Sequence, residues 1–334
     1  MAEAPRDDRA LWTQLAAQIA VDSIRATTAA GSGHPTSSMS CAHLLAVLAA
    51  SHLRCDLEQL GAPTNDRLIL SKGHAAPALY ATLKALGTID DRELLSLRRL
   101  GSRIEGHPAP VDGMPMVEVA TGSLGQGLSA GLGMALAMRL EHSPARVWVV
   151  LGDSEMAEGS VWEALETAAY HGVRNLTAII DVNRLGQRGP TMLGWDCDAF
   201  VARARAFGWR ALSIDGHDVA EIDRAYREAA DGSAPTLVAA RTEKGHGVSF
   251  LANAEGWHGK PLSADEAERA ITELGGEGSV RITPPAPVAT AGTPHREPSL
   301  ADSASRYLPL YQGPVATRKA FGEALAALAP HWPD

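Results

Sequence analysis

Cysteine and long apolar runs are both scarce in this sequence of 334 residues. The three cysteines, Cys41, Cys55 and Cys197, are odd in number and lack the spacing of metal ligands, so they indicate neither a disulfide framework nor a zinc site. No uncharged apolar run is long enough to span a bilayer, and residues 1–10 lack the apolar segment of a secretion signal. We therefore expect a cytoplasmic protein with reduced thiols.

An excess of positive charge is also absent. The chain has 30 Lys and Arg against 39 Asp and Glu, a formal net charge of -9, which argues against nonspecific binding of nucleic acids or anionic membranes. An anionic substrate would then need a local positive pocket. Hydrophobic residues make up 45% of the chain, enough for a globular protein with a sizeable core.

Segments with strand and helix patterns alternate over the first 240 residues. Five short apolar runs predict buried strands: Arg67–Leu70, Val147–Leu151, Leu176–Asp181, Arg210–Ile214 and Thr236–Arg241. Helical spacing predicts helices over Leu11–Ala30, Ser37–Leu53 and about Ile222–Ala230, and Asp218 with Glu221 resembles a capping box before the last. The alternation predicts an α/β fold, a doubly wound and mostly parallel sheet with flanking helices.

The composition changes after about Leu274. Residues 282–294 are rich in proline and small residues and have no apolar period, which is typical of a linker. Val315–Ala329 has the pattern of one amphipathic helix, too little to form a domain core. We expect a domain over residues 1–274, a linker over 275–314, and over 315–334 the first helix of another domain.

Two polar segments directly follow neighbouring predicted strands. Asp153 comes after the second strand and Asn183 after the third, so both side chains are expected at the carboxyl edge of the sheet. Their oxygens, with the carbonyl of Leu185, suit Mg²⁺, with Ca²⁺ or Mn²⁺ as substitutes. The turn at Gly152 allows backbone amides to approach a diphosphate at the start of the following helix.

The run from Gly152 to Gln187 resembles the thiamine-diphosphate signature of transketolases. Six further segments follow one another in transketolase order: Gly31–Ser37, Ser71–Ala75, Gly106–Pro108, Thr121–Gly127, Gly256–Pro261 and Ala316–Ala320. The resemblance covers nearly the whole chain but only the front half of a transketolase. It implies the thiamine-diphosphate-binding fold of the diphosphate domain, as the N-terminal half or as one of the subunits of a split transketolase.

The resemblance gives roles to four histidines in predicted loops. It implies that His34, His107 and His258 are catalytic, binding the carbonyl and hydroxyl oxygens of the sugar and moving protons. His74 and His258 would approach the diphosphate of the cofactor. An imidazole with a pKa near neutrality suits this work.

The resemblance also implies further cofactor and substrate contacts. The remaining cofactor-binding positions are Ser37, Gly122, Ser123, Leu124, Ser154, Asn183, Gln187 and Lys244. Ser154 stands where transketolases generally have glycine, so a positive φ there would strain the backbone. Arg318 matches an arginine that binds the phosphate of the substrate, a role that suits its guanidinium group.

A transketolase moves a two-carbon ketol unit from a ketose phosphate to an aldose phosphate. In the family, the missing half carries the pyrimidine-binding domain with the glutamate that activates the cofactor. We therefore expect a homo- or hetero-oligomer with a C-terminal transketolase chain that supplies this domain, and no activity without it.

Two other functions stay open from the sequence. The chain could be a non-catalytic remnant or a truncated fragment that binds cofactor or partner without turnover. Gly125–Gly131 also resembles a loose glycine fingerprint of NAD(P)-dependent oxidoreductases, with Asp153 as the acid that binds the ribose. That interpretation ranks low, because it leaves Asn183 and the loop histidines unexplained.

Overall fold

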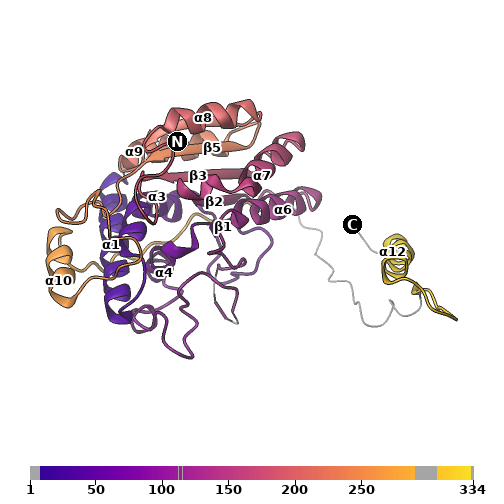
Figure 1. Ribbon diagram of the computed structural model, residues 1–334, viewed down its shortest axis with the longest axis horizontal. Coiled ribbons are helices and arrows are strands. Elements are labelled where there is room, and N and C mark those ends of the chain that lie inside the picture. The colour runs from indigo at the N-terminus through magenta and orange to yellow at the C-terminus, as the bar shows by residue number, and fades with distance from the viewer. Residues whose placement is uncertain (1–7, 112, 115, 290–306, 332–334) are drawn as a thin grey trace. The chain divides into compact units, whose positions relative to one another are not determined.

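A five-stranded parallel sheet forms the centre of the larger unit (Figure 1). The computed structural model describes residues 8–111, 113–114, 116–289 and 307–331. The strands are β1 (Arg67–Leu70), β2 (Val147–Gly152), β3 (Leu176–Val182), β4 (Arg210–Asp215) and β5 (Thr236–Arg241), in the order β1-β2-β3-β5-β4. Every neighbouring pair is parallel, which confirms the predicted α/β fold.

The apolar runs form strands because the sheet is buried on both faces. In β2, Trp148 and Val150 belong to one hydrophobic core, whereas Val147, Val149 and Leu151 belong to the other. Successive side chains of a strand point to opposite faces. A strand covered on both sides therefore shows a continuous apolar run in the sequence.

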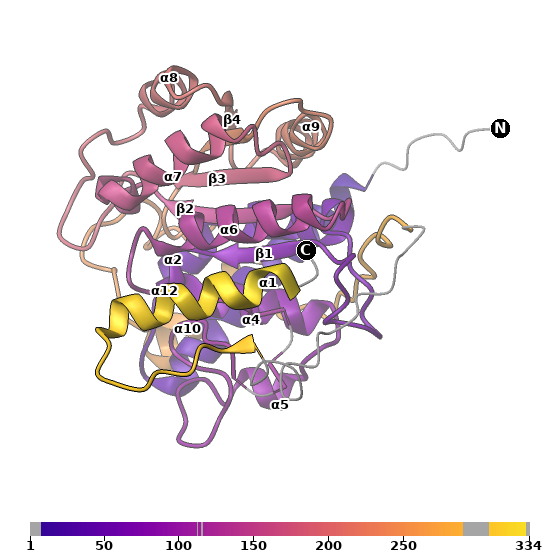
Figure 2. The same cartoon turned by 90° about the vertical axis from the view of Figure 1, so that its right-hand side faces the viewer.

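Helices form a layer on each face of the sheet. One layer contains α1 (Arg9–Ala30), α3 (Ala42–Val47), α4 (Ala76–Ala85) and α9 (Val219–Ala230). The other contains α6 (Gln126–Leu140), α7 (Gly159–Tyr170) and α8 (Cys197–Ala206), and Figure 2 looks onto it, with α6 beside α7. Shorter elements complete the unit: α2 (Pro35–Ser40), η1 (Leu48–His52), η2 (Gly73–Ala75), α5 (Asp91–Leu94), η3 (Ser154–Ala157) and α10 (Ala264–Glu273).

The single helix predicted over Ser37–Leu53 is wrong. The segment divides into α2, α3 and the π-helix η1, and the break lies at Cys41, which has φ -97° and ψ 6°. The Ser40 hydroxyl shares its one proton between the carbonyl of Ser37, at 3.0 Å, and the Asp181 carboxylate, at 2.6 Å. Such bonds from serine to the backbone compete with the helix ladder and bend helices.

The predicted start of α9 is only partly right. Asp218 accepts hydrogen bonds from the amides of Ala220 at 2.8 Å and Glu221 at 3.2 Å, so it is a helix N-cap. Glu221 does not close a capping box, because its carboxylate accepts from the amide of Asp215 instead. The described residues contain a complete capping box at Ser263, at the start of α10.

Contacts divide the chain into two units, Met1–Val288 and Ala289–Asp334. The front of the predicted linker packs on the first unit: Val280 accepts from the side chain of Gln18 at 3.2 Å, and Ile282 donates to Ala85 at 3.0 Å. Residues 290–306 of that linker lie outside the described residues.

The second unit contains α12 (Thr317–Leu328), within two residues of the helix predicted over Val315–Ala329. Its assignment to a pyrimidine-binding domain stays a prediction, as do the domain boundaries. No helix in the described parts of the chain has the length and apolar character needed to cross a bilayer.

Candidate functional site

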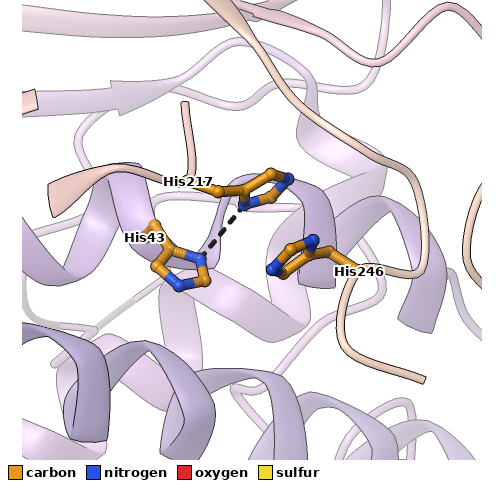
Figure 3. Close-up of side chains that lie close together, drawn as sticks. All are labelled: His43, His217 and His246. Carbon is orange, nitrogen blue, oxygen red and sulfur yellow. Dashed lines mark hydrogen bonds between the residues drawn. The ribbon is translucent and has the colours of Figure 1, made fainter. Parts of the chain in front are cut away.

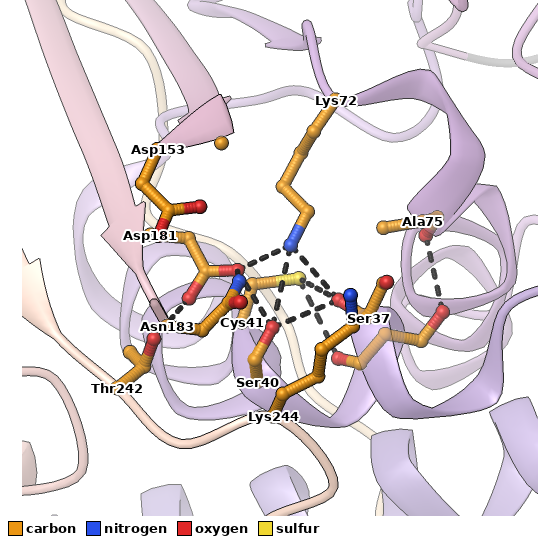
Figure 4. Close-up of polar contacts among 12 residues, drawn as sticks. Ser37, Ser40, Cys41, Lys72, Ala75, Asp153, Asp181, Asn183, Thr242 and Lys244 are labelled. Carbon is orange, nitrogen blue, oxygen red and sulfur yellow. Dashed lines mark hydrogen bonds and ion pairs between the residues drawn. The ribbon is translucent and has the colours of Figure 1, made fainter. Parts of the chain in front are cut away.

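Polar side chains from four strands gather at the carboxyl edge of the sheet (Figure 4). Lys72 follows β1, Asp153 follows β2, Asn183 follows β3, and Lys244 follows β5. Ligands of open α/β sheets bind at this edge, where the order of strands reverses. The parallel topology therefore brings together residues that lie far apart in the chain.

A buried ion pair between Lys72 and Asp181 lies at the centre of this edge. The exposed fractions of the two residues are 1% and 0%. Burial opposes both charges, but their attraction raises the pKa of Lys72 and lowers that of Asp181. The pair is further hydrogen-bonded by the Ser37 carbonyl, the hydroxyls of Ser40 and Thr242, and the Asn183 amide.

Asp153 is a buried carboxylate that forms no ion pair with any other described residue. Its Oδ1 accepts from the amide of Ser154 at 2.9 Å, and its Oδ2 accepts from the amide of Arg184 at 2.7 Å and from the Thr191 hydroxyl at 3.1 Å. Burial raises its pKa to about 6. A divalent cation would supply the positive charge that this carboxylate lacks.

Asn183 and Leu185 place further oxygen atoms beside Asp153. The Asn183 amide nitrogen donates to Asp181 at 3.1 Å, which fixes the orientation of the side chain, and its Oδ1 accepts from the Leu185 amide at 3.2 Å. The Leu185 carbonyl accepts from the Lys244 ammonium at 2.9 Å. Carboxylate, amide and carbonyl oxygens together form a donor set for a hard cation.

Lys244 gives this acidic protein the local positive pocket that an anionic ligand needs. Its ammonium lies 2.8 Å from Nδ1 of His258, and both residues line a cavity of ≈ 110 Å³ together with Leu185 and Gln187. Burial, with repulsion by Lys72, lowers the pKa of Lys244 to about 8. At neutral pH the pocket therefore carries a poorly solvated positive charge.

Three of the four predicted histidines form one cluster. The ring centroids of His34, His74 and His258 lie 4.9–5.2 Å apart. Burial, and repulsion by nearby cations, lowers the pKa of His34 to about 4 and of His258 to about 3. Neutral rings at physiological pH can each accept and donate one hydrogen bond.

Two buried polar atoms in this region have no hydrogen-bond partner among the described residues. They are Nδ1 of His34 and the hydroxyl of Ser37. Buried polar groups are normally paired, so an unpaired one marks the place of a missing partner. Both residues are predicted site residues, and the unpaired atoms fit a ligand bound at this edge.

The fourth histidine, His107, contacts the glycine segment predicted to approach the cofactor. Gly122 has φ +129°, and a Cβ atom there would lie 2.6 Å from Cδ2 of His107. Any larger residue would therefore displace the ring and strain the backbone. Ser123 and Leu124 follow directly in the turn before α6, where Ser123 is exposed and Leu124 is half-buried.

The expected strain at Ser154 is absent. Ser154 opens η3 and is not among the residues with positive φ, so a side chain is tolerated there. With Gln187 it lines a second cavity of ≈ 300 Å³. Arg318 is exposed on α12 in the second unit, and its role stays a prediction.

Residues 12–297 match a family model described as transketolase, thiamine diphosphate binding domain. The chain belongs to the transketolase family. Human transketolase is 43% identical over 318 residues, which cover 93% of this chain and 49% of that protein. The solved transketolase from Campylobacter jejuni has a TM-score of 0.73 at 31% identity, and the match covers 82% of this chain and 44% of that one.

A shorter protein is also similar. It is one of the subunits of the apulose-4-phosphate transketolase of Phocaeicola vulgatus, and it is 35% identical over 246 residues, which cover 73% of this chain and 87% of that protein. By contrast, this chain spans about half the length of the curated full-length transketolases that it matches.

Membership of the transketolase family leaves no support for a nicotinamide site at Gly125–Gly131. That site requires a strand directly before the glycines. Residues 116–124 form no strand, and Gly125 is the N-cap of α6.

Sequence reasoning missed three charged residues of this candidate site: Lys72, Asp181 and Glu155. Glu155, 1% exposed, accepts from the amides of Gly125 at 2.8 Å and Gly152 at 3.1 Å, so it ties the start of α6 to the end of β2. Lys72 and Glu155 lie inside segments that match transketolases, and that was the available signal. Asp181 lies in the matching run Gly152–Gln187 as well, at the end of an apolar strand.

Proposed function

We propose that the chain binds thiamine diphosphate together with Mg²⁺ at the carboxyl edge of the sheet. The observation that carries this proposal is the buried carboxylate of Asp153, which has no cationic partner among the described residues and accepts from the Arg184 amide, between Asn183 and Leu185. It lies within the domain that matches the family model. Ca²⁺ and Mn²⁺ have similar ligand preferences and are expected to substitute.

The residues around the metal ligands would hold the rest of the cofactor. Lys244, His74 and His258 face the position of the diphosphate, and Ser37 and Gln187 add polar groups. Gly122, Ser123, Leu124 and Ser154 would contribute further contacts through their backbone. Bound thiamine diphosphate supplies the nucleophilic carbon for the transfer of a two-carbon ketol unit.

His34, His107 and His258 are proposed to bind the sugar and to move its protons. The pKa values of His34 and His258 lie well below the near-neutral values expected from the sequence, and that of His107 is also lowered. The rings are therefore neutral at pH 7, and one ring nitrogen can accept a hydrogen bond from a hydroxyl while the other donates one to a carbonyl oxygen. Substrates would be a ketose phosphate and an aldose phosphate, with Arg318 as a candidate for the phosphate group.

A partner chain would complete the enzyme. The chain spans about half the length of full-length transketolases, and one relative is named as part of a transketolase made of separate subunits. We propose a C-terminal transketolase chain with a pyrimidine-binding domain, in a homo- or hetero-oligomer. A cytoplasmic location and a role in the pentose phosphate pathway are part of the same proposal.

The affinity for thiamine diphosphate and Mg²⁺ is expected to be highest between about pH 6 and pH 8. The pKa of Asp153 is raised to about 6, so protons compete with the metal for its carboxylate below pH 6. The affinity is then expected to fall about tenfold for each pH unit. Above pH 8 Lys244, with its pKa lowered to about 8, loses the charge that attracts the diphosphate. Calorimetric titrations at pH 5–9 and constant ionic strength measure the profile, and a flat profile contradicts both assignments.

Ketol transfer is tested with the purified chain, thiamine diphosphate, Mg²⁺, a ketose phosphate and an aldose phosphate. We expect no turnover by the chain alone and activity after addition of the chain that co-purifies with it from native cells. Turnover by the rigorously pure chain contradicts the need for a partner. Cofactor binding without activity in the presence of the co-purified chain would favour a non-catalytic binding module.

A further inference from the structure

A second histidine cluster lies apart from the residues assigned above. His43 belongs to α3, His217 to the loop between β4 and α9, and His246 to the loop after β5 (Figure 3). The ring centroids of His217 and His246 are 3.5 Å apart, and that of His43 lies 5.0–5.3 Å from both. The proposed cofactor and substrate contacts include none of the three rings.

The nitrogens of this cluster have the spacing of metal ligands. One ring nitrogen of each histidine lies within 4.8 Å of the others, and the only such group in the described ranges is this one. Nδ1 of His43 and Nδ1 of His217 are 3.3 Å apart. Two nitrogens bound to a tetrahedral ion at about 2.0 Å are about 3.3 Å apart, so this pair already has the required separation.

The surroundings favour a cation over three unbound rings. Nδ1 of His43 faces Nδ1 of His217, and both rings are half-buried. Nδ1 of His246 is buried without a hydrogen bond within the described residues, and the Glu243 carboxylate lies 3.5 Å from it. A carboxylate beside Nδ1 favours a proton on that nitrogen and leaves Nε2 of the same ring free to bind a metal.

We propose that His43, His217 and His246 bind one transition-metal ion of the Zn²⁺ type, separately from the Mg²⁺ site. Imidazole nitrogens suit Zn²⁺, Cu²⁺, Ni²⁺ and Co²⁺, whereas Mg²⁺ prefers oxygen ligands. The ion would join α3, the β4–α9 loop and the loop that carries Lys244. It would act as a clip that stabilises the folded chain, because the three ligands come from distant parts of the sequence.

The hydrogen bonds of His217 predict that metal binding changes the tautomer of its ring. The amide of Glu243 donates to Nε2 of His217 at 2.8 Å, so the neutral ring carries its proton on Nδ1 and donates it to His43. A neutral ring bound through Nδ1 carries its proton on Nε2, so metal binding would move the proton from Nδ1 to Nε2 and break the hydrogen bond from the Glu243 amide. The ring of His246, stacked on His217 at an interplanar angle of 11°, must turn for its nitrogen to face the same ion.

The test uses the full chain, freed of metal and titrated with Zn²⁺ and Co²⁺ in the absence of thiamine diphosphate. We expect one ion per chain and a visible absorption spectrum of tetrahedral Co²⁺. Zn²⁺ should also raise the unfolding temperature of the chain, since a ligand that binds only the folded state stabilises it.

Two variants and two controls separate this site from others. His43→Gln and His246→Gln are each expected to lower the affinity for Zn²⁺ at least about 100-fold and to remove the rise in unfolding temperature. His171→Gln, an exposed histidine at the end of α7, and Asp153→Ala should retain both. Circular dichroism establishes that each variant is folded.

Two outcomes overturn the proposal. One is the absence of stoichiometric Zn²⁺ binding by the folded wild-type chain. The other is binding that persists in both variants and disappears in His34→Asn, which would place the ion at the histidines of the proposed sugar site. Neither outcome depends on ketol transfer, so this test and that of the proposed function fail independently.

Discussion

Replacement of Asp153 by alanine is expected to abolish Mg²⁺-dependent binding of thiamine diphosphate. Asp153 is the proposed anionic metal ligand, and its carboxylate is buried. A mobile surface carboxylate therefore cannot easily take its place. Loss of a group that merely orients a metal ligand already costs about 10–100-fold in affinity, so loss of the ligand should cost at least about 100-fold. Calorimetric titration of the cofactor with and without Mg²⁺ measures the effect.

The control variants separate charge from structure. Asp153→Asn retains an oxygen that can accept from the Arg184 amide, yet it should also lose most of the Mg²⁺ dependence, because it lacks the negative charge. Glu166→Gln, on the exposed side of α7, should bind like the wild type. Unfolding temperatures show whether each variant is folded, and unchanged affinity in folded Asp153→Ala would refute the metal assignment.

The strand layout could be predicted because the sheet is buried on both faces. The strands read as apolar runs except β4, an edge strand in which buried and exposed residues alternate, and parallel strands must end at one common edge. The order of strands and polar segments therefore sufficed to predict that Asp153 and Asn183 lie together. The structure adds that the Asp153 carboxylate accepts from the amide next to Asn183, that of Arg184, at 2.7 Å.

The break at Cys41 could not be predicted, because Ser40 has a distant partner besides its local one. Ser40 donates to the carboxylate of Asp181 at 2.6 Å, a partner 141 residues away. Apolar periodicity reports only which face of a helix is buried, so it continues through the break. The resemblance to transketolases did not help, since it concerns positions that contact the cofactor.

The histidine cluster escaped prediction for a similar reason. His43, His217 and His246 have no mutual spacing that resembles a metal motif, because α3 and two loops bring them together. Metal sites are readable from sequence when ligands lie a few residues apart on one element. A site assembled from three distant elements can be recognised only when the fold is known.

Replacement of Lys72 by methionine is expected to lower the free energy of unfolding by about 3–5 kcal/mol. Methionine fills much of the space of the lysine stem but leaves the Asp181 carboxylate buried without its cation. The hydroxyls of Ser40 and Thr242 still donate to that carboxylate, which limits the loss. Denaturant unfolding at pH 7 measures it.

A double-mutant cycle shows whether the loss comes from the unpaired charge. Asp181→Asn in the Lys72→Met background removes the buried charge, so the double variant should be more stable than Lys72→Met alone. Lys319→Met breaks only an exposed ion pair with Glu323 and should change stability by less than about 0.5 kcal/mol. If Lys72→Met and Lys319→Met lowered the free energy of unfolding equally, the Lys72–Asp181 ion pair would contribute no more to stability than a surface ion pair does.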